Sequence, residues 1–278
     1  KMETHNPLPI FAFGNMRFAR IAENWVVHIL KCQIHEFKIF CHDKDLQRFL
    51  VTRFPEHTEK FIFNADTAFK IEPAKIDDYF QFRKILFRKI LLENEEFIFS
   101  DLDAIWLTDV RNHFREPGVD FVLQKVVHGK ACPLDVRWEI GYTGCMGLWY
   151  MRKTSAMLDF LQLFINDHEK HDQRSMNRLI FNHKDKQAHT CKDGYQRVNI
   201  QGLTIAFANE TILARPYYRR QYNSFSAKGV VHPVVKEGTS TIKTLQSFNL
   251  WHPRTYRSSL SQCFELLYKF QRKMRRLD

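Results

Sequence analysis

Short apolar runs alternate with helical patterns from the start of this chain, and that alternation restricts its possible folds more than any other feature. Residues 8–13, 37–41 and 61–63 are apolar runs of strand length, and apolar side chains recur at helical spacing between the first two. Strands that alternate with helices favour a mostly parallel, doubly wound sheet flanked by helices. Ligands of such sheets bind at the carboxyl ends of the strands.

The alternation continues into the middle of the chain. Residues 76–93 are predicted to form a helix with several basic residues, followed by a strand at 96–100. The later predicted elements are a strand at 121–127, a turn and strand at 141–151, a helix at 155–166 and a surface loop at 183–197.

One hydrophobic core is enough for a chain of this size. The 278 residues are 44% hydrophobic and 14% aromatic, so a division into two independent domains is not required. We predict one domain over residues 1–258 and a basic amphipathic helix over 259–278 that packs on it. With Phe264, Leu267 and Phe270 on one side, this helix also suits a peripheral contact with an anionic membrane.

Charge and cysteine spacing narrow the classes of partner. The net charge of +11 favours a polyanion, which includes nucleic acid, an anionic membrane surface and phosphate-bearing substrates. Known nucleic-acid-binding motifs are absent, so we expect no specific nucleic-acid partner. The six cysteines show neither CxxC pairs nor metal-ligand spacing, which argues against a structural zinc site.

Asp101 and Asp103 place two carboxylates where the chain leaves a predicted apolar strand. Such a pair suits a hard divalent cation with oxygen ligands. Mg²⁺ or Mn²⁺ bound there would bridge diphosphate oxygens and neutralise the charge that develops on a leaving group. An aspartate cap followed by a solvated aspartate would produce the same isolated pattern, so the surrounding sequence has to decide.

The surroundings of this pair resemble a known family. The run from Phe97 to Leu107, preceded by the basic helix, resembles the DxD region of retaining GT-A glycosyltransferases. The resemblance is strongest to the GT77 nucleotide-diphospho-sugar transferases, which include α-xylosyltransferases and α-galactosyltransferases, and more distant to the glycogenin-like family. Further segments match in the same order over residues 8–252: Asn24-Trp25, Gly144, the DQxxxN pattern Asp172 to Asn177, and a late segment with His232, Gly238 and Lys243.

The sequence also departs from that family at three points. Tyr142 stands where the family has the Asn of an Asn-x-Gly turn, and Pro233 replaces a small residue after the late histidine. One extra residue separates Gly238 from Lys243. These departures affect the expected contacts to the donor sugar more than the expected metal site.

The resemblance implies a fold and a reaction. The fold would be a single GT-A domain with a Rossmann-like, mostly parallel sheet flanked by helices. The reaction would be a metal-dependent transfer of a sugar from a UDP-sugar to a hydroxyl of a glycan or glycoprotein, with retention of configuration. Xylose and galactose are the first expectations, because the family uses them.

The resemblance also assigns the metal site. His232 would complete it with Asp101 and Asp103. Imidazole beside two carboxylates suits Mn²⁺ somewhat better than Mg²⁺.

The remaining residues of the expected site follow from the same family pattern. Arg83, Lys84 and Lys243 would supply positive charge to the diphosphate. Asp172 and Gln173 are the expected catalytic residues, beside the anomeric carbon. The other expected donor-binding residues are Ala12, Phe13 and Asn15 at the nucleotide base and ribose, and Leu102, Gly144 and Gly238.

The compartment stays open at this point. If Met2 is the native start, we expect a cytoplasmic enzyme, and if the chain is a trimmed type II protein, we expect the Golgi lumen.

Two alternatives belong to other classes. A phosphatase of the haloacid dehalogenase type also has DxD after an apolar strand, but its motif opens the catalytic domain. Here the motif begins only at residue 101, and no later Gly-Asp pair has suitable spacing. A basic nucleic-acid-binding module is suggested by charge and by the aromatic and basic residues at 215–222.

Overall fold

A nine-stranded sheet organises the part of the chain that this computed structural model describes, which is residues 7–63, 76–126, 142–183, 190–192, 195–208, 212–216, 229–235 and 239–252. In sheet order the strands are β3 (Phe61–Ile62), β2 (Phe37–Cys41), β1 (Ile10–Gly14), β4 (Glu96–Ser100), β7 (Thr143–Arg152), β6 (Phe121–Val126), β10 (Leu203–Ala208), β9 (Tyr195–Ile200) and β8 (Thr190–Lys192). Strands β7 and β9 run against the others, so the sheet is mostly parallel, as predicted.

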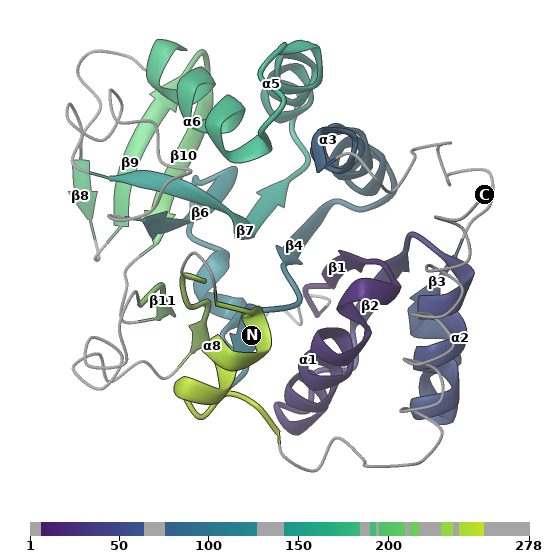
Figure 1. Cartoon of the computed structure of the whole chain (residues 1–278). Helices are drawn as coiled ribbons and strands as arrows, with labels where there is room; N and C mark the ends of the chain where they lie inside the picture. Colours follow the sequence, from purple (N-terminus) through teal and green to yellow (C-terminus); the bar gives the residue numbers. More distant parts are fainter. Residues whose placement is uncertain are drawn as a thin grey trace.

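Helices cover both faces of this sheet (Figure 1). One face carries α1 (Ala19–Lys31) and α2 (Lys44–Arg53). The other carries α3 (Ile76–Glu93), α5 (Ser155–Asn166) and α6 (Asp172–His183). The other described helices are three short 3₁₀ helices, η1 (Met16–Phe18), η2 (Pro55–Lys60) and η3 (Arg111–Phe114), and the helix α8 (Thr241–Ser247).

The central strands are apolar on both faces because each face is covered. In β1, Ile10 and Ala12 belong to the core under α1 and α2, whereas Phe11 and Phe13 belong to the core under α3. The period of two that sends alternate side chains to opposite faces therefore finds a helix on each side. This explains why the strands read as continuous apolar runs.

A second, three-stranded sheet joins distant parts of the chain. Its order is β11 (Leu213–Ala214), β12 (Val230–Val231) and β5 (Ile105–Trp106). Strand β12 is antiparallel to β5, with Val231 opposite Ile105, so the residues after β12 return to the residues before β5. This small sheet has direct consequences for the site described below.

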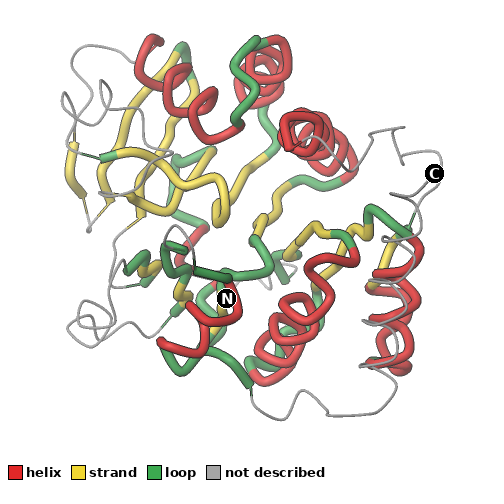
Figure 2. The backbone as a smooth tube through the Cα atoms, viewed as in Figure 1, coloured by secondary structure: helices red, strands yellow, loops and turns green. Residues whose placement is uncertain are grey.

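The structure corrects one prediction about the chain path. Residues 183–197 do not form only a loop, because β8 and the start of β9 lie within them at the edge of the sheet (Figure 2). On α3, the side chains of Arg83 and Lys84 are both buried. The predicted C-terminal helix at 259–278 lies outside the described residues. None of the helices in the described part of the chain combines the length and apolar character needed to cross a membrane.

The contact between α1 and β5 predicts an acid sensitivity. Half-buried His28 lies with Nδ1 3.2 Å from the Trp106 carbonyl oxygen, and burial together with His252 lowers the pKa of His28 from 6.5 to about 4. The unfolded chain therefore takes up this proton at a higher pH than the native state. The stability that the neutral ring contributes is present above pH 6.5 and is lost as the pH falls towards 4.

We expect His28 to account for a loss of about 2 kcal/mol in the free energy of unfolding between pH 8 and pH 5. His28→Asn keeps an amide donor for the carbonyl without the titration, so its stability should fall by less over the same interval. Urea unfolding of both proteins at the two pH values measures the difference. Equal pH dependence would contradict this assignment.

Candidate active site

The loop after β4 is held by a buried hydroxyl. Ser100 Oγ accepts hydrogen bonds from the indole N–H groups of Trp25 and Trp106, each at 3.1 Å, and donates to the Asp101 carbonyl oxygen at 3.2 Å. The Asp101 N–H donates to the Gly147 carbonyl oxygen of β7 at 2.6 Å. The backbone that carries Asp101 is therefore fixed from α1, from β5 and from β7.

Removing the Ser100 hydroxyl should lower the stability of the protein, because two buried indole N–H groups donate to it. Ser100→Ala leaves two buried N–H donors without their acceptor, so we expect the free energy of unfolding to fall by about 1–3 kcal/mol. Trp106→Phe should then cost less in the Ser100→Ala protein than in the wild type, because the shared bond is already gone. Urea unfolding of the four proteins gives the coupling energy, and strictly additive losses would contradict a shared network.

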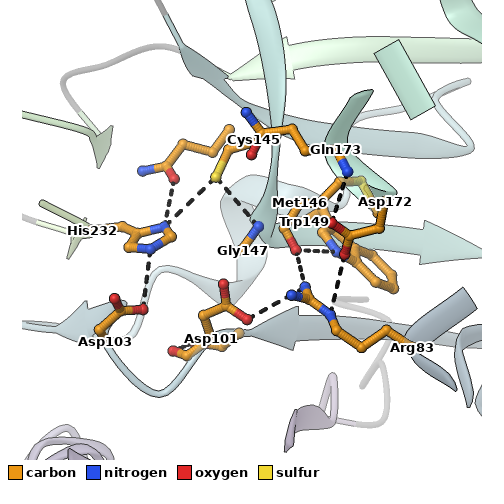
Figure 3. A network of polar contacts seen from close by, with 12 residues as sticks. Arg83, Asp101, Asp103, Cys145, Met146, Gly147, Trp149, Asp172, Gln173 and His232 are labelled. Carbon is orange, nitrogen blue, oxygen red and sulfur yellow. Dashed lines mark hydrogen bonds and ion pairs between the residues drawn. The ribbon is translucent and has the colours of Figure 1, made fainter. Parts of the chain in front are cut away.

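Asp101, Asp103 and His232 form a cluster at the end of β4. One ligand atom from each lies within 4.8 Å of the others, and His232 Nε2 is 3.1 Å from Asp103 Oδ1 (Figure 3). The small sheet explains this meeting, because His232 directly follows β12 and Asp103 lies just before β5. Three residues that are far apart in sequence thus converge as the family resemblance implies.

Gly147 makes room for this cluster. A Cβ atom at position 147 would lie 2.2 Å from His232 Cε1 and 2.5 Å from Asp101 Oδ2. No side chain fits at those distances without displacing both groups. The backbone of β7 is therefore one wall of the site, in direct contact with the histidine and the carboxylate.

The cluster carries opposing electrostatic influences. Burial and the neighbouring Asp103 raise the pKa of Asp101, although the positive charges of Arg83 and His232 act to lower it. Burial would also raise the pKa of Asp103, but the charge and hydrogen bond of His232 hold it below its usual range. Burial and Arg215 lower the pKa of His232, but Asp103 and Cys145 outweigh them and raise it to about 9. The carboxylates of Asp101 and Asp103 thus create a site that favours a positively charged group.

Arg83 connects this cluster to a third carboxylate. Its Nη2 is 3.4 Å from Asp101 Oδ1 and its Nε is 3.3 Å from Asp172 Oδ2. The same guanidinium donates to the Met146 carbonyl oxygen at 2.5 Å and lies over the ring of Phe99, 5.0 Å from its centroid. A buried cation with this many contacts fixes the relative positions of Asp101 and Asp172 (Figure 3).

Asp172 and Gln173 begin α6 and are both buried. Further along that helix, the Asn177 side chain exchanges two hydrogen bonds with the backbone of Gly144, at 2.6 and 2.8 Å. This exchange attaches α6 to the start of β7. The first turn of the helix consequently faces the same space as the cluster.

The cluster opens into a cavity of about 360 Å³. Its described walls include Arg83, Asp101, Asp103, Asp172, Gln173 and His232 from the predicted set. Phe80 and His171, whose rings stack with centroids 4.5 Å apart, lie at another part of the wall. The cavity therefore combines charged side chains with an aromatic surface.

The structure does not bring two of the predicted diphosphate cations to this cavity. Lys84 is fully buried and donates to the Asp167 and Glu169 carbonyl oxygens at 3.2 and 2.9 Å, so it holds the α5–α6 loop. Lys243 is exposed on the first turn of α8. Neither lines the described walls of the cavity, and their contact with a diphosphate stays a prediction.

The predicted nucleotide loop lies beside the cluster of Asp101, Asp103 and His232 without lining the cavity. The side chains of Ala12 and Phe13 are buried on opposite faces of β1, and Asn15 accepts from the Arg17 N–H at the start of η1. A Cβ at Gly14 would lie 2.7 Å from Leu102 Cδ1, so this loop touches the DxD segment.

Two predicted glycines have different outcomes. Gly144 packs its backbone against Leu123, 2.6 Å from a Cβ placed there, and has the Asn177 contacts described above. Gly238 lies outside the described residues.

Several residues of the cavity were missed by sequence reasoning. Gly147, Cys145 and Arg215 line it, and Gln124 contacts His232 from the buried side of β6. The sequence offered one usable signal, since Gly147 follows Gly144 in an otherwise apolar strand, where glycine marks a close approach. Arg215 and Gln124 had no such signal.

The sequence matches one family model. Residues 32–231 match the model described as nucleotide-diphospho-sugar transferase, which is more than half of the chain. No functionally curated protein matches the amino-acid sequence.

Solved structures share the fold at low sequence identity. A structure titled as the galactosyltransferase LgtC with donor and acceptor sugar analogues aligns with a TM-score of 0.53 and 10% identity, over 92% of this chain and 100% of that one. Apo mouse xyloside xylosyltransferase 1 aligns with a TM-score of 0.50 and 13% identity, over 84% and 99%. The apo bifunctional glycosyltransferase WbbM aligns with a TM-score of 0.53 and 11% identity over 86% of this chain, which spans only 47% of that protein. These structures establish the GT-A type of fold.

Proposed function

Because this chain belongs to the nucleotide-diphospho-sugar transferase family, we propose that it moves a sugar from a UDP-sugar to an acceptor hydroxyl, using a divalent metal ion at Asp101, Asp103 and His232. The observation that carries this proposal is the convergence of these three ligands beside Asp172 in one cavity. Packing alone gives no reason to place three carboxylates in one buried site.

The donor set of the cluster fits a divalent cation. Two carboxylates and one imidazole suit Mn²⁺, and Mg²⁺ is the second choice. Because position 147 is glycine, no β-carbon occupies the space beside the Asp101 carboxylate and the His232 imidazole. When bound there, the ion would neutralise negative charge on the diphosphate leaving group.

The chain's own residues would position the donor sugar. Asp172 and Gln173 lie across the cavity from the cluster, on the first turn of α6, so the anomeric carbon is expected between them and the diphosphate. Arg83 holds Asp101 and Asp172 in fixed relation, which keeps the two ends of the site at a constant separation. Its charge also balances the carboxylates when the cavity is empty of ligand.

Three finer features of the proposal rest on resemblance. Retention of configuration, by departure and attack on the same face, follows from the similarity to retaining GT-A enzymes and to the GT77 family in particular. Xylose and galactose are the favoured sugars because the GT77 family uses them, and a galactosyltransferase and a xylosyltransferase share the fold of this chain. A glycan or glycoprotein is the proposed acceptor.

Donor hydrolysis tests the proposal directly. The purified protein is incubated with a panel of UDP-sugars and GDP-sugars, with Mn²⁺ or with chelator, and the released nucleotide diphosphate is measured. We expect release from one UDP-sugar that depends on metal. The proposal fails if no donor is turned over, with or without a panel of glycan acceptors, and if Mn²⁺ with UDP also leaves the thermal stability unchanged.

A further inference from the structure

Phe80 and His171 form an aromatic pair in the wall of the cavity. Their rings stack with centroids 4.5 Å apart and with 25° between the ring planes. Phe80 is half-buried, and 31% of the His171 side chain is accessible, so part of the pair is open to a ligand. The expected metal, diphosphate and donor-sugar contacts give this pair no role.

A series of contacts places the aromatic pair next to Asp172. Arg83 lies between the cluster and Asp172, 3.4 Å from Asp101 Oδ1 and 3.3 Å from Asp172 Oδ2. Beyond it, His171 Nδ1 is 3.6 Å from Asp172 Oδ1, and the His171 ring meets Phe80. The pair therefore adjoins the end of the cavity where the donor sugar is expected, with Arg83 and Asp172 separating it from the cluster.

The loop that carries His171 is attached to the helix that carries Phe80. Buried Lys84 of α3 donates to the Asp167 and Glu169 carbonyl oxygens at 3.2 and 2.9 Å. Glu169 Oε1 then accepts a hydrogen bond from the His171 N–H at 3.2 Å. Both members of the stack are thus held in place before any ligand arrives, which lowers the entropic cost of binding to them.

The wall of the cavity also has apolar side chains, which are Val126, Pro233, Val234 and the partly exposed Val235. A ligand that contacts them and the aromatic pair needs apolar surface as well as a reactive hydroxyl. A sugar ring has both, because its C–H groups carry partial positive charge that suits the negative face of an aromatic ring. A serine or threonine side chain is too small to cover two stacked rings.

We propose that Phe80 and His171 form an acceptor subsite, and that the acceptor hydroxyl belongs to a sugar ring and not to a serine or threonine side chain. This inference rests on the proposed function, which places the donor sugar beside Asp172. A sugar ring on the aromatic pair is the next group along the cavity. Its hydroxyl is thereby brought towards the anomeric carbon.

An acceptor panel tests the chemical class. Transfer from the UDP-sugar found in the donor panel is measured to methyl glycosides of glucose, galactose and xylose, and to peptides that contain serine and threonine. We expect kcat/KM for the best methyl glycoside to exceed that for the best peptide by at least about 10-fold. A peptide that is used as well as the best glycoside overturns the proposal, and so does donor hydrolysis without transfer to any of the glycosides.

Phe80→Leu tests the stack, because it removes the ring and keeps apolar bulk. We expect the KM for the methyl glycoside to rise by about 10-fold and the KM for the donor to stay within about twofold. Phe80→Tyr keeps the ring and should restore the acceptor KM. A merely structural role of Phe80 would change both KM values together.

Phe63→Leu is the matched control. Phe63 is also half-buried but does not belong to the described wall of the cavity, so its variant should keep both KM values. Thermal unfolding of each variant checks that the fold is retained. If Phe80→Leu does not fold, His171→Leu gives the same measurement at the other ring of the stack.

The outcomes separate this inference from the proposed function. An unchanged acceptor KM in Phe80→Leu overturns the subsite, and a rise in the donor KM alone assigns the ring to the donor sugar and overturns it as well. The proposed function stands in both cases. A wild-type protein that turns over no donor, and that Mn²⁺ with UDP does not stabilise, overturns both.

Discussion

Asp103→Asn should reduce the metal-dependent release of UDP by about 10³-fold, the largest effect that we expect from a single polar substitution. Asp103 contributes one of two carboxylates to the cluster and is the group that faces His232 Nε2. An asparagine side chain keeps the shape but removes the negative charge that a divalent ion needs. Initial rates with saturating Mn²⁺ and the donor found in the panel measure the loss.

A matched carboxylate lies a short distance along the chain. Asp109 pairs with Arg111 and does not line the cavity. Asp109→Asn removes the same charge at a partly exposed pair, so its effect on activity should stay within about twofold. Activity of Asp103→Asn within tenfold of the wild type, in a protein that unfolds at the normal temperature, would contradict the metal site.

Gly147→Ala should remove metal binding through a single methyl group. The added Cβ would overlap His232 Cε1 and Asp101 Oδ2, at 2.2 and 2.5 Å, so the two ligands have to separate. We expect the affinity for Mn²⁺ to fall by at least about 100-fold, with a similar fall in turnover, because a displacement near 1 Å is enough to disorganise such a site. Titration of Mn²⁺ followed by electron paramagnetic resonance gives the affinity.

The control is a glycine with free space around it. Gly118 has a φ of +72° and no atom within 4 Å of an added Cβ. Asparagine is one of the residues that tolerate this backbone conformation, so the Gly118→Asn protein should bind Mn²⁺ normally. Normal Mn²⁺ affinity in Gly147→Ala would show that the cluster can expand and that the close packing against β7 is not required.

The sequence predicted the framework of this site because its signals are local. The strand before Asp101 is a short apolar run, and the helices at 76–93 and 155–166 have apolar side chains near helical spacing; the structure confirms all three. The motif also marked the right loop. His232 was found only through the order of family segments, since one histidine among 13 has no distinguishing pattern of its own.

The parts that could not be predicted depend on packing between distant segments. Lys84 lies on a helix of ordinary amphipathic pattern, and only the carbonyl groups of the α5–α6 loop make its burial possible. Strands β5, β11 and β12 have two residues each, too few for a period to be read. Arg215 follows β11 and Gln124 lies on β6, so their contacts with His232 appear only in three dimensions.

If the proposed metal site binds Mn²⁺, the pairing of β5 with β12 makes that ion a test of complete folding. The two carboxylates come from the middle of the chain, but the imidazole arrives only when residues 229–232 have paired with Ile105 and Trp106. A partly folded chain that has built only β1, β4 and β7 would offer the carboxylates without the histidine. Mn²⁺ would bind such a species weakly and the finished protein well, so the ion shifts the equilibrium toward the closed sheet. Protection of the β12 amides from hydrogen exchange should therefore increase with Mn²⁺ more than protection of β2.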